Sequence, residues 1–118
     1  MLTKEYTPIS EEEYLRLEVQ SPTRHEYVRG DVFAMTGGTL RHNVIASNVL
    51  AALRTHLRGT PCQVFINDVR LRVAKAIAYY YPNLLVSCAR EGQSIDLNSG
   101  GVEDAVLVIA ILSESTEA

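Results

Sequence analysis

The sequence lacks an apolar run long enough to span a bilayer, which needs ~20 consecutive apolar residues, and this excludes a membrane-spanning helix. Its N-terminus, MLTKEYTPIS, lacks the apolar core of a secretory signal. Both absences predict a cytoplasmic protein without membrane contact. Cysteines are few, and Cys62 and Cys88 belong to no CxxC pair or Cys/His cluster. We therefore expect reduced thiols and no zinc site.

The chain also lacks an excess of positive charge, because its net charge is −3 at pH 7. That value alone argues against a nucleic-acid-binding protein. The charge is unevenly distributed, however: residues 41–75 hold six Lys or Arg and one Asp, a net +5, between segments of −3 and −5. This middle segment is either an ordinary solvated surface or a binding surface for a polyanion such as DNA. A DNA-binding surface would use Arg54, Arg58, Arg70 and Arg72.

Local patterns predict elements in the first half of a single domain. Ser10 followed by Glu13 is a capping-box pattern and predicts a helix over residues 11–18. Two short strands joined by a tight turn, a β-hairpin, are predicted over residues 25–35. From Leu40 to Leu57 apolar residues such as Ile45 recur at helical spacing, which predicts the main helix, packed on one face of a sheet.

The second half is rich in strand patterns. Residues 63–73 predict strand structure with Arg70 and Arg72 facing outward. Residues 89–103 are polar and predict a loop. Residues 105–112, AVLVIAIL, are apolar throughout and predict a central buried strand. A helix start is expected from Ser113 onward, so the domain is expected to be incomplete at its C-terminus.

The stretch Ile77–Cys88, IAYYYPNLLVSC, is the most strand-like of the chain. Pro82 cannot donate to a sheet ladder, so it predicts a bulge, an edge or a strand start within this stretch. Such irregularities often place a side chain at an active site, and here that side chain is Asn83.

Taken alone, the residues leave function open. The candidate site residues are His25, Glu26, His42, Asp68 and Asn83. Each has a structural alternative: the histidines as surface or capping residues, Glu26 as a strand-surface carboxylate, and Asp68 as a turn former.

The order of motifs is more specific. The segments HEYVRGDVFAMTGGTLRHNVIASNVLAALRTHL, CQVFINDVRLRV, YYYPNLLVSC and VLVIAILSEST resemble the Uma-two family of putative restriction endonucleases, a branch of the PD-(D/E)xK nuclease superfamily. The resemblance implies an α/β (α+β) fold, in which a mixed β-sheet is flanked by helices. It also implies Mg²⁺-dependent hydrolysis of DNA, in which carboxylates on adjacent strands hold the metal.

In this resemblance Glu26 matches the glutamate of the first hairpin. Asn83 stands where the family has an aspartate, and Ala110 stands where it has a strand glutamate. The family's lysine would lie beyond Ala118. Glu26 and Asn83 remain as candidate metal ligands, and His42 and Asp68 are further candidates for holding the metal together with Glu26.

We therefore expect a nuclease-like protein with weak or absent Mg²⁺ binding and impaired catalysis. The alternative is a non-catalytic module that binds nucleic acid or oligomerises. Because the predicted last strand is left without a partner, a homodimer or hetero-oligomer is expected.

Overall fold

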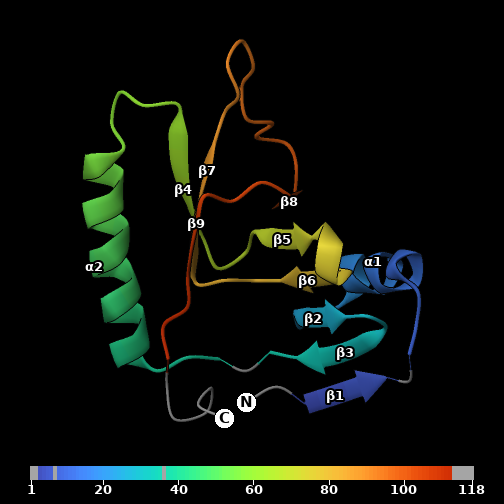
Figure 1. Cartoon of the computed structure of the whole chain (residues 1–118). Helices are drawn as coiled ribbons and strands as arrows, with labels where there is room; N and C mark the ends of the chain where they lie inside the picture. The colour runs from blue at the N-terminus through green and yellow to red at the C-terminus, as the bar shows by residue number, and fades with distance from the viewer. Residues whose placement is uncertain (1–2, 7, 36, 113–118) are drawn as a thin grey trace.

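The computed structural model describes residues 3–6, 8–35 and 37–112. Two β-sheets lie side by side, and each is covered on one face by one helix (Figure 1). The expected α+β class with helices flanking a sheet is confirmed. The expected single sheet, however, is divided into two.

The larger sheet holds the predicted hairpin, which is confirmed. From one edge to the other, the strands of the larger sheet are β1 (Thr3–Tyr6), β3 (Asp31–Ala34), β2 (His25–Val28), β6 (Ala78–Tyr80), β5 (Arg70–Val73) and β8 (Gly101–Val102). All neighbours are antiparallel except β5 and β8, so the sheet is mixed.

Helix α1 (Glu11–Gln20) covers this sheet, and its start is the predicted one. The Ser10 side chain accepts a hydrogen bond from the Glu13 N–H at 3.1 Å, which satisfies one of the free donors of the first turn. Tyr14 is the buried residue of the helix, and its ring centroid lies 4.8 Å from that of Tyr27 and 5.2 Å from that of Tyr79. This aromatic cluster fixes α1 on the sheet.

The smaller sheet has the order β4 (Cys62–Ile66), β7 (Leu84–Cys88) and β9 (Leu107–Ile109), all antiparallel. The main helix is confirmed as α2 (Leu40–His56), with Thr39 as its N-cap. It packs on this sheet through Ala46, Val49, Leu50, Leu53 and Leu57. The prediction for Ile45 is wrong, because its side chain is 42% exposed.

The stretch Ile77–Cys88 contributes to both sheets. Its first part, β6, pairs with β2 and β5 in the larger sheet, and its second part, β7, is the centre of the smaller one. Pro82 lies between the two strands and has no ladder position to fill. Of the three predicted alternatives, a bulge, an edge or a strand start, the structure agrees with the last, since β7 begins two residues after Pro82.

The prediction of a central buried strand over residues 105–112 is wrong. Only Leu107–Ile109 form a strand, and β9 is an edge of its sheet. Val106 is 68% exposed and Val108 is 48% exposed. The apolar composition is that of a covered strand, but no described element lies beyond β9.

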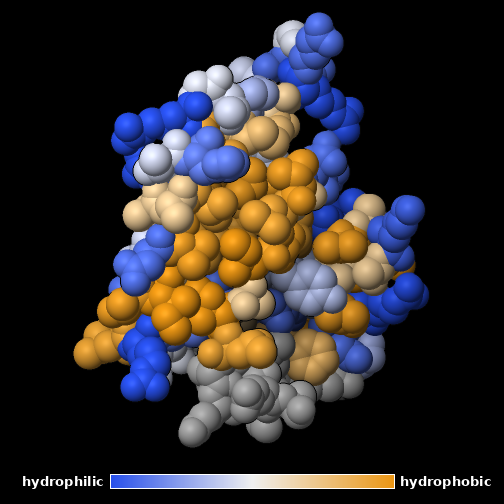
Figure 2. Space-filling model, turned by 60° about the vertical axis from the view of Figure 1, so that its left-hand side comes forward, coloured by the Kyte–Doolittle hydropathy of each residue, from blue (hydrophilic) through white to orange (hydrophobic). Residues whose placement is uncertain are grey.

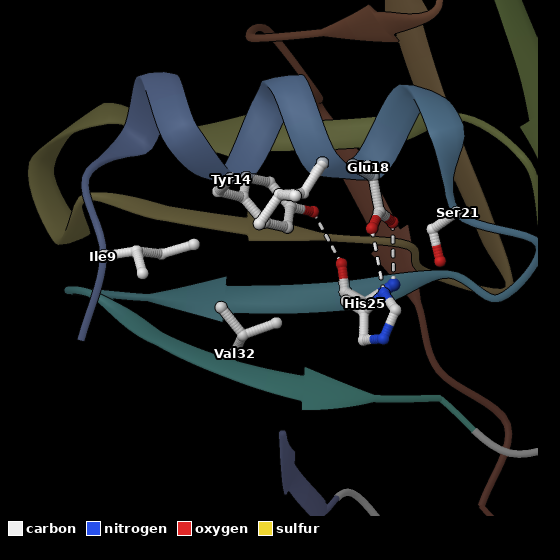
Figure 3. Close-up of a pocket in the computed structure, with 7 residues that line it drawn as sticks. Ile9, Tyr14, Glu18, Ser21, His25 and Val32 are labelled. Carbon is white, nitrogen blue, oxygen red and sulfur yellow. Dashed lines mark hydrogen bonds and ion pairs between the residues drawn. The ribbon is translucent and has the colours of Figure 1, made fainter. Parts of the chain in front are cut away.

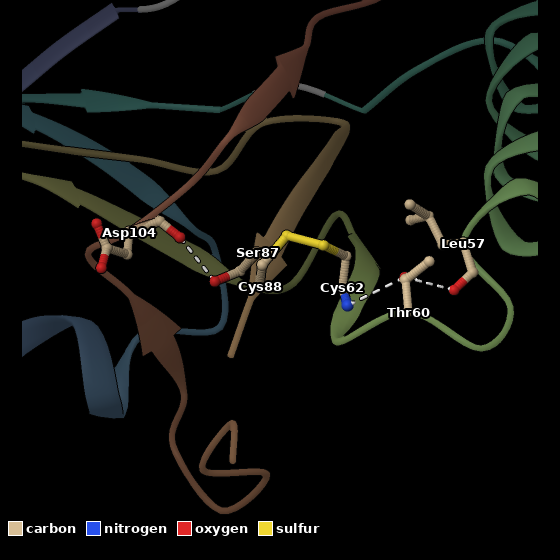
Figure 4. The surroundings of a disulfide bond; sticks show 6 residues. All are labelled: Leu57, Thr60, Cys62, Ser87, Cys88 and Asp104. Carbon is tan, nitrogen blue, oxygen red and sulfur yellow. Dashed lines mark hydrogen bonds between the residues drawn. A yellow bond between two sulfur atoms is a disulfide. The ribbon is translucent and has the colours of Figure 1, made fainter. Parts of the chain in front are cut away.

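The expected free thiols are also corrected. Cys62 and Cys88 are directly opposite each other in the β4–β7 ladder and form a disulfide (Figure 4). Both ends of the bridged segment are further held by hydrogen bonds: Thr60 Oγ1 accepts from the Cys62 N–H, and Ser87 Oγ donates to the Asp104 carbonyl. The disulfide therefore lies at the end of the β4–β7 ladder that is farther from Asn83.

Two further expectations concern the rest of the chain. The predicted loop over residues 89–103 is largely irregular, but its last residues include β8. The helix start expected from Ser113 lies outside the described residues. No helix in the described ranges has the length and apolarity needed to cross a membrane.

Candidate functional site

The ends of three strands meet at Asn83. The Asn67 N–H, just after β4, donates to the Asn83 carbonyl at 3.1 Å. The β7–β9 register pairs Leu84 with Ile109, so its continuation by one residue places Asn83 opposite Ala110. The two positions where the resemblance implies metal-binding acids are therefore neighbours across the sheet.

The polar atoms at this sheet end bond to one another. Asn83 Oδ1 accepts a hydrogen bond from the Ile111 N–H at 2.7 Å. The Ile111 carbonyl in turn accepts from His42 Nε2–H of α2 at 3.0 Å. Because a carbonyl oxygen can only accept, this contact places the proton on Nε2 of His42. The amide oxygen and this ring nitrogen are thus both engaged within the protein.

The direction of the Glu26 side chain is set by contacts that its neighbour His25 makes on the other face of β2. Its neighbour His25 is buried under α1, where the Glu18 carboxylate accepts from the His25 backbone N–H at 2.7 Å and contacts Nδ1 at 3.0 Å (Figure 3). Tyr14 Oη–H donates to the His25 carbonyl at 2.6 Å. Since side chains alternate along a strand, fixing His25 under α1 turns Glu26 toward the other face of the sheet.

Burial sets the electrostatics of Glu26. Its half-buried position raises the pKa of the carboxyl above the usual range, and a backbone hydrogen bond from Tyr81 partly lowers this pKa again. Tyr81 precedes Asn83 by only two residues, so the backbone that contacts Glu26 leads directly to Asn83. The Glu26 carboxyl therefore contacts the backbone of the segment that connects the two sheets, two residues before Asn83.

Asp68 belongs to the rim of this region. Its carboxylate pairs with Arg24, which in turn lies over the Tyr81 ring at 5.7 Å. The Asp68 side chain is 88% exposed. The turn-forming interpretation fits this position, since Asn67 and Asp68 connect β4 to the residues before β5.

The donor set does not fit a magnesium ion. Mg²⁺ binds through several hard oxygen ligands, normally including carboxylates. Within residues 3–6, 8–35 and 37–112, no three His, Cys, Asp or Glu side chains are grouped so that they could hold a metal ion. Glu26 is the carboxylate of the family positions that remains, and the Asn83 oxygen is already hydrogen-bonded. Support from His42 and Asp68 is not found, because each has another partner.

The four arginines expected at a DNA surface fall into two groups. Arg54 and Arg58 are exposed at the C-terminal end of α2, beside an open groove of about 230 Å³ that also contacts Thr60 and Gln63. Arg70 and Arg72 line a different groove of about 370 Å³ on the larger sheet.

The outward orientation expected for Arg72 is wrong. Its guanidinium donates to Glu11 Oε1 at 3.2 Å and to the Tyr79 hydroxyl at 3.1 Å, on the face covered by α1. Its charge is therefore compensated within the protein, and Glu103 adds a further carboxylate at 3.5 Å. Arg70 lies over the Tyr79 ring at 5.7 Å.

Sequence reasoning missed the residues that position the site, namely Glu18, Arg24, Asn67 and Tyr81. For Glu18, the sequence indicated only that it lies on a helix. Its carboxylate accepts a hydrogen bond from Tyr81 Oη–H at 2.9 Å, and the two residues are 63 positions apart. No local pattern reports such a contact. The residue type of Asn67 did indicate a turn, because asparagine tolerates the left-handed backbone conformation that Asn67 adopts, with φ of 40°.

Known proteins are similar to this chain in sequence and in fold. The sequence model of the Uma2 family, described as "Putative restriction endonuclease", matches residues 11–118. Two proteins of Synechocystis sp. (strain ATCC 27184 / PCC 6803 / Kazusa) are similar. The uncharacterized protein slr1290 is 32% identical over 114 residues, 96% of this chain and 58% of its own length. The uncharacterized protein sll1609 is 28% identical over 103 residues, 87% of this chain and 58% of its own length. The chain thus spans less than two thirds of both relatives.

A solved structure shares the fold. The crystal structure of a putative nuclease belonging to DUF820 from Anabaena variabilis ATCC 29413 superimposes with a TM-score of 0.74 at 18% sequence identity. The match covers 93% of this chain and 62% of that chain. At this identity the likeness shows a common fold.

Proposed function

Because the chain belongs to the Uma2 family of putative restriction endonucleases, we propose that it is a nuclease-fold protein whose Mg²⁺-dependent DNA hydrolysis is impaired. One observation carries the proposal. The adjacent positions at which the family resemblance implies metal-binding acids hold Asn83 and Ala110, and the Asn83 oxygen is bonded to the Ile111 N–H. Glu26 is left as the single carboxylate among these family positions, and it contacts the backbone of Tyr81.

Electrostatics gives the size of the effect. A pair of unit charges 4 Å apart interacts by about 4 kcal/mol at an effective dielectric constant near 20. Two missing carboxylates, each facing a doubly charged ion, are therefore expected to lower Mg²⁺ affinity by several orders of magnitude. Stabilisation of the charge that develops on the phosphate during hydrolysis is lost together with the metal.

The direct test is nicking of supercoiled plasmid in Mg²⁺ or Mn²⁺, with Glu26→Ala as the comparison. We expect no metal-dependent nicking by either protein. Turnover by the wild type that disappears in Glu26→Ala would contradict the proposal, since it would show a working site built on Glu26.

Restoring the charges provides a positive test. The double variant Asn83→Asp/Ala110→Glu is expected to bind Mn²⁺ measurably in isothermal titration calorimetry, where the wild type does not. The matched control Asn98→Asp/Ala52→Glu adds the same two charges at exposed positions. Equal Mn²⁺ binding by both double variants would show that net charge, rather than the site, attracts the ion.

A second function is favoured by the position of Arg54 and Arg58. Both are exposed beside an open groove, which suits binding of a DNA backbone without cleavage. The affinity is then expected to fall steeply with salt, and Arg54→Ala/Arg58→Ala is expected to reduce the slope of log K against log salt by ~2.

The control for this test is Arg16→Ala/Arg90→Ala, which removes two arginines paired with Glu13 and Asp104. It changes the net charge equally and is expected to leave the slope near that of the wild type. If the two double variants behave alike in a fluorescence-anisotropy titration, the groove at the end of α2 is not the DNA site.

A further inference from the structure

The disulfide lies on the face of the small sheet that α2 covers. Cys62 and Cys88 pack against the same buried cluster as Leu57 at the end of this helix. Thr60 anchors the Cys62 end of the bridge, because its hydroxyl accepts from the Cys62 N–H at 3.2 Å and donates to the Leu57 carbonyl at 2.6 Å (Figure 4). Since Leu57 is the C-cap of α2, the bridge lies beside the point where the helix ends.

An open groove borders one end of the bridge. Of the described residues, Cys62 lines this groove of about 230 Å³ and Cys88 does not. A Cβ atom placed on Gly59, which also lines the groove, would meet no atom within 4 Å, so this part of the groove is open to solvent. Figure 2, in which the α2 side of the molecule comes forward, shows polar side chains gathered at the upper end of this face, where α2 stops.

The groove is positively charged. Arg54 and Arg58 line it and are exposed, and no Asp or Glu is found among the described residues of its lining. Neither arginine forms an ion pair with another described residue. A depression that carries charge of one sign raises the local concentration of ions of the opposite sign. A small anion that enters this groove therefore meets the Cys62 end of the disulfide.

A thiolate is an anion that reacts with a disulfide. Attack of an external thiolate on Cys62 Sγ forms a mixed disulfide at Cys62 and releases Cys88 as a thiolate, which takes a proton from water. A second external thiolate attacks the external sulfur of the mixed disulfide and releases Cys62. Two external thiols are then oxidised to one disulfide, and the protein disulfide is reduced to two thiols. Positive surroundings favour this exchange because they stabilise thiolates.

We propose that the groove at the end of α2 is an exchange site for a low-molecular-weight thiol that carries carboxylates, with Cys62 as the exchanging sulfur. Arg54 and Arg58 bind the carboxylates, since guanidinium groups form strong paired hydrogen bonds with them. Cys88 re-forms the bridge by attacking the mixed disulfide and expelling the thiol. The proposal uses the same arginines as the DNA-binding alternative, but it needs no DNA and is tested without it.

The first test compares thiols of different charge. The reduction rate of the disulfide in the whole chain is followed by alkylation and mass spectrometry with anionic glutathione, neutral 2-mercaptoethanol or cationic cysteamine. Arg54→Ala/Arg58→Ala is expected to slow the reaction with glutathione by about 10-fold and not to slow the reaction with cysteamine. The matched control Arg16→Ala/Arg41→Ala removes two exposed arginines that do not line the groove, and it is expected to react like the wild type.

Three results of this comparison would overturn the proposal. The first is an unchanged rate with glutathione in Arg54→Ala/Arg58→Ala. The second is equal slowing with all three thiols, which would show a general change in access to the bridge without selection by charge. The third is a native protein in which Cys62 and Cys88 are both free before any thiol is added.

Single substitutions identify the exchanging sulfur. Cys88→Ser is expected to form a mixed disulfide with oxidised glutathione at Cys62, detected by mass spectrometry. Cys62→Ser loses the same bridge and is expected to react about 10-fold more slowly, because Cys88 lies outside the charged groove. Circular dichroism verifies that both variants are folded, and the comparison of charged thiols decides the proposal even if the loss of the bridge unfolds them. Equal or faster modification of Cys88 in folded variants would overturn the assignment of Cys62.

Discussion

The side-chain oxygen of Asn83 accepts a hydrogen bond from the backbone N–H of Ile111, at 2.7 Å. This contact joins β7 to the residues after β9 at the point where their ladder ends. It continues through the Ile111 carbonyl to His42 of α2. A position that the family resemblance assigns to metal binding thus contributes here to holding two strands and a helix together.

This role predicts a stability effect for Asn83. Replacing it with alanine leaves the half-buried Ile111 N–H without its acceptor, which is expected to lower the free energy of unfolding by about 1–2 kcal/mol. Asn83→Asp retains an oxygen acceptor and is expected to lose less. Urea unfolding measures both, with Asn98→Ala in the exposed loop as the control. Equal losses in Asn83→Ala and Asn98→Ala would show that the Ile111 contact contributes nothing.

The elements that could be predicted from the sequence are those with local signals. Ser10 and Glu13 identify the start of α1, and the apolar spacing from Leu40 identifies α2, because helix caps and helical periodicity depend on residues within a few positions. The prediction failed for β9. Its composition indicates a covered strand, but what covers a strand is decided by elements that its own residues do not specify.

The family resemblance placed Asn83 and Ala110 on neighbouring strands, and β7 and β9 do pair in the structure. Whether these positions form a site stays a prediction. The outward direction of Arg72 followed from strand alternation alone, and it was wrong because α1 brings Glu11 onto that face of the sheet. The alternation of side chains assigns residues to the two faces of a strand. It does not say which face a helix covers, because that depends on the tertiary structure.

The disulfide predicts a measurable dependence on redox conditions. It joins residues 26 positions apart, and closing a loop of this size is expected to stabilise the fold by about 3–4 kcal/mol. Reduction should therefore lower the midpoint of urea unfolding. The double variant Cys62→Ala/Cys88→Ala should unfold at a lower midpoint that a reductant no longer changes.

Thiol alkylation before and after reduction measures how much of the bridge forms. Protection of both cysteines until a reductant is added supports the bridge. Rapid alkylation of both cysteines in the untreated native protein would instead support the free thiols that the sequence alone predicts.

Tyr14 is expected to be the most sensitive position under α1. Its ring is buried against Tyr27 and Tyr79, and Tyr14→Ala is expected to cost about 3–5 kcal/mol through the cavity that it leaves. Tyr14→Phe keeps the ring but removes the hydroxyl that donates to the His25 carbonyl, at an expected cost of about 1–2 kcal/mol. Thermal unfolding compares them with Tyr80→Phe, a partly exposed control.

The ionisation of Tyr14 is an independent check on the same packing. Burial holds the pKa of the Tyr14 hydroxyl well above its usual range. Ultraviolet titration should therefore show a tyrosine that stays protonated under alkaline conditions until the protein unfolds, and this signal should be missing in Tyr14→Phe. Its persistence in that variant would assign it to another tyrosine.

Glu26 predicts the pH dependence of stability. Burial raises the pKa of this carboxyl in the folded protein above its ordinary value of 4.5, so the folded state binds the proton more tightly than the unfolded state. The stability contributed by the protonated form is complete below the unfolded pKa and is lost as pH rises through the folded pKa. Glu26→Gln, which stays neutral, is therefore expected to be more stable than the wild type at pH 7.

Because the wild-type carboxyl is itself protonated in acid, the advantage of Glu26→Gln should shrink as the pH falls through the folded pKa, and it should be absent below the unfolded pKa of about 4.5. Thermal unfolding of both proteins at several pH values measures this difference. Glu91→Gln, in the exposed loop, controls for the change in net charge. If Glu26→Gln were less stable than the wild type at pH 7 and equal to it in acid, the carboxylate would be stabilised by a favourable partner that outweighs its burial. That result would make Glu26 a group held ionised for binding a cation, and it would count against the proposed loss of the metal site.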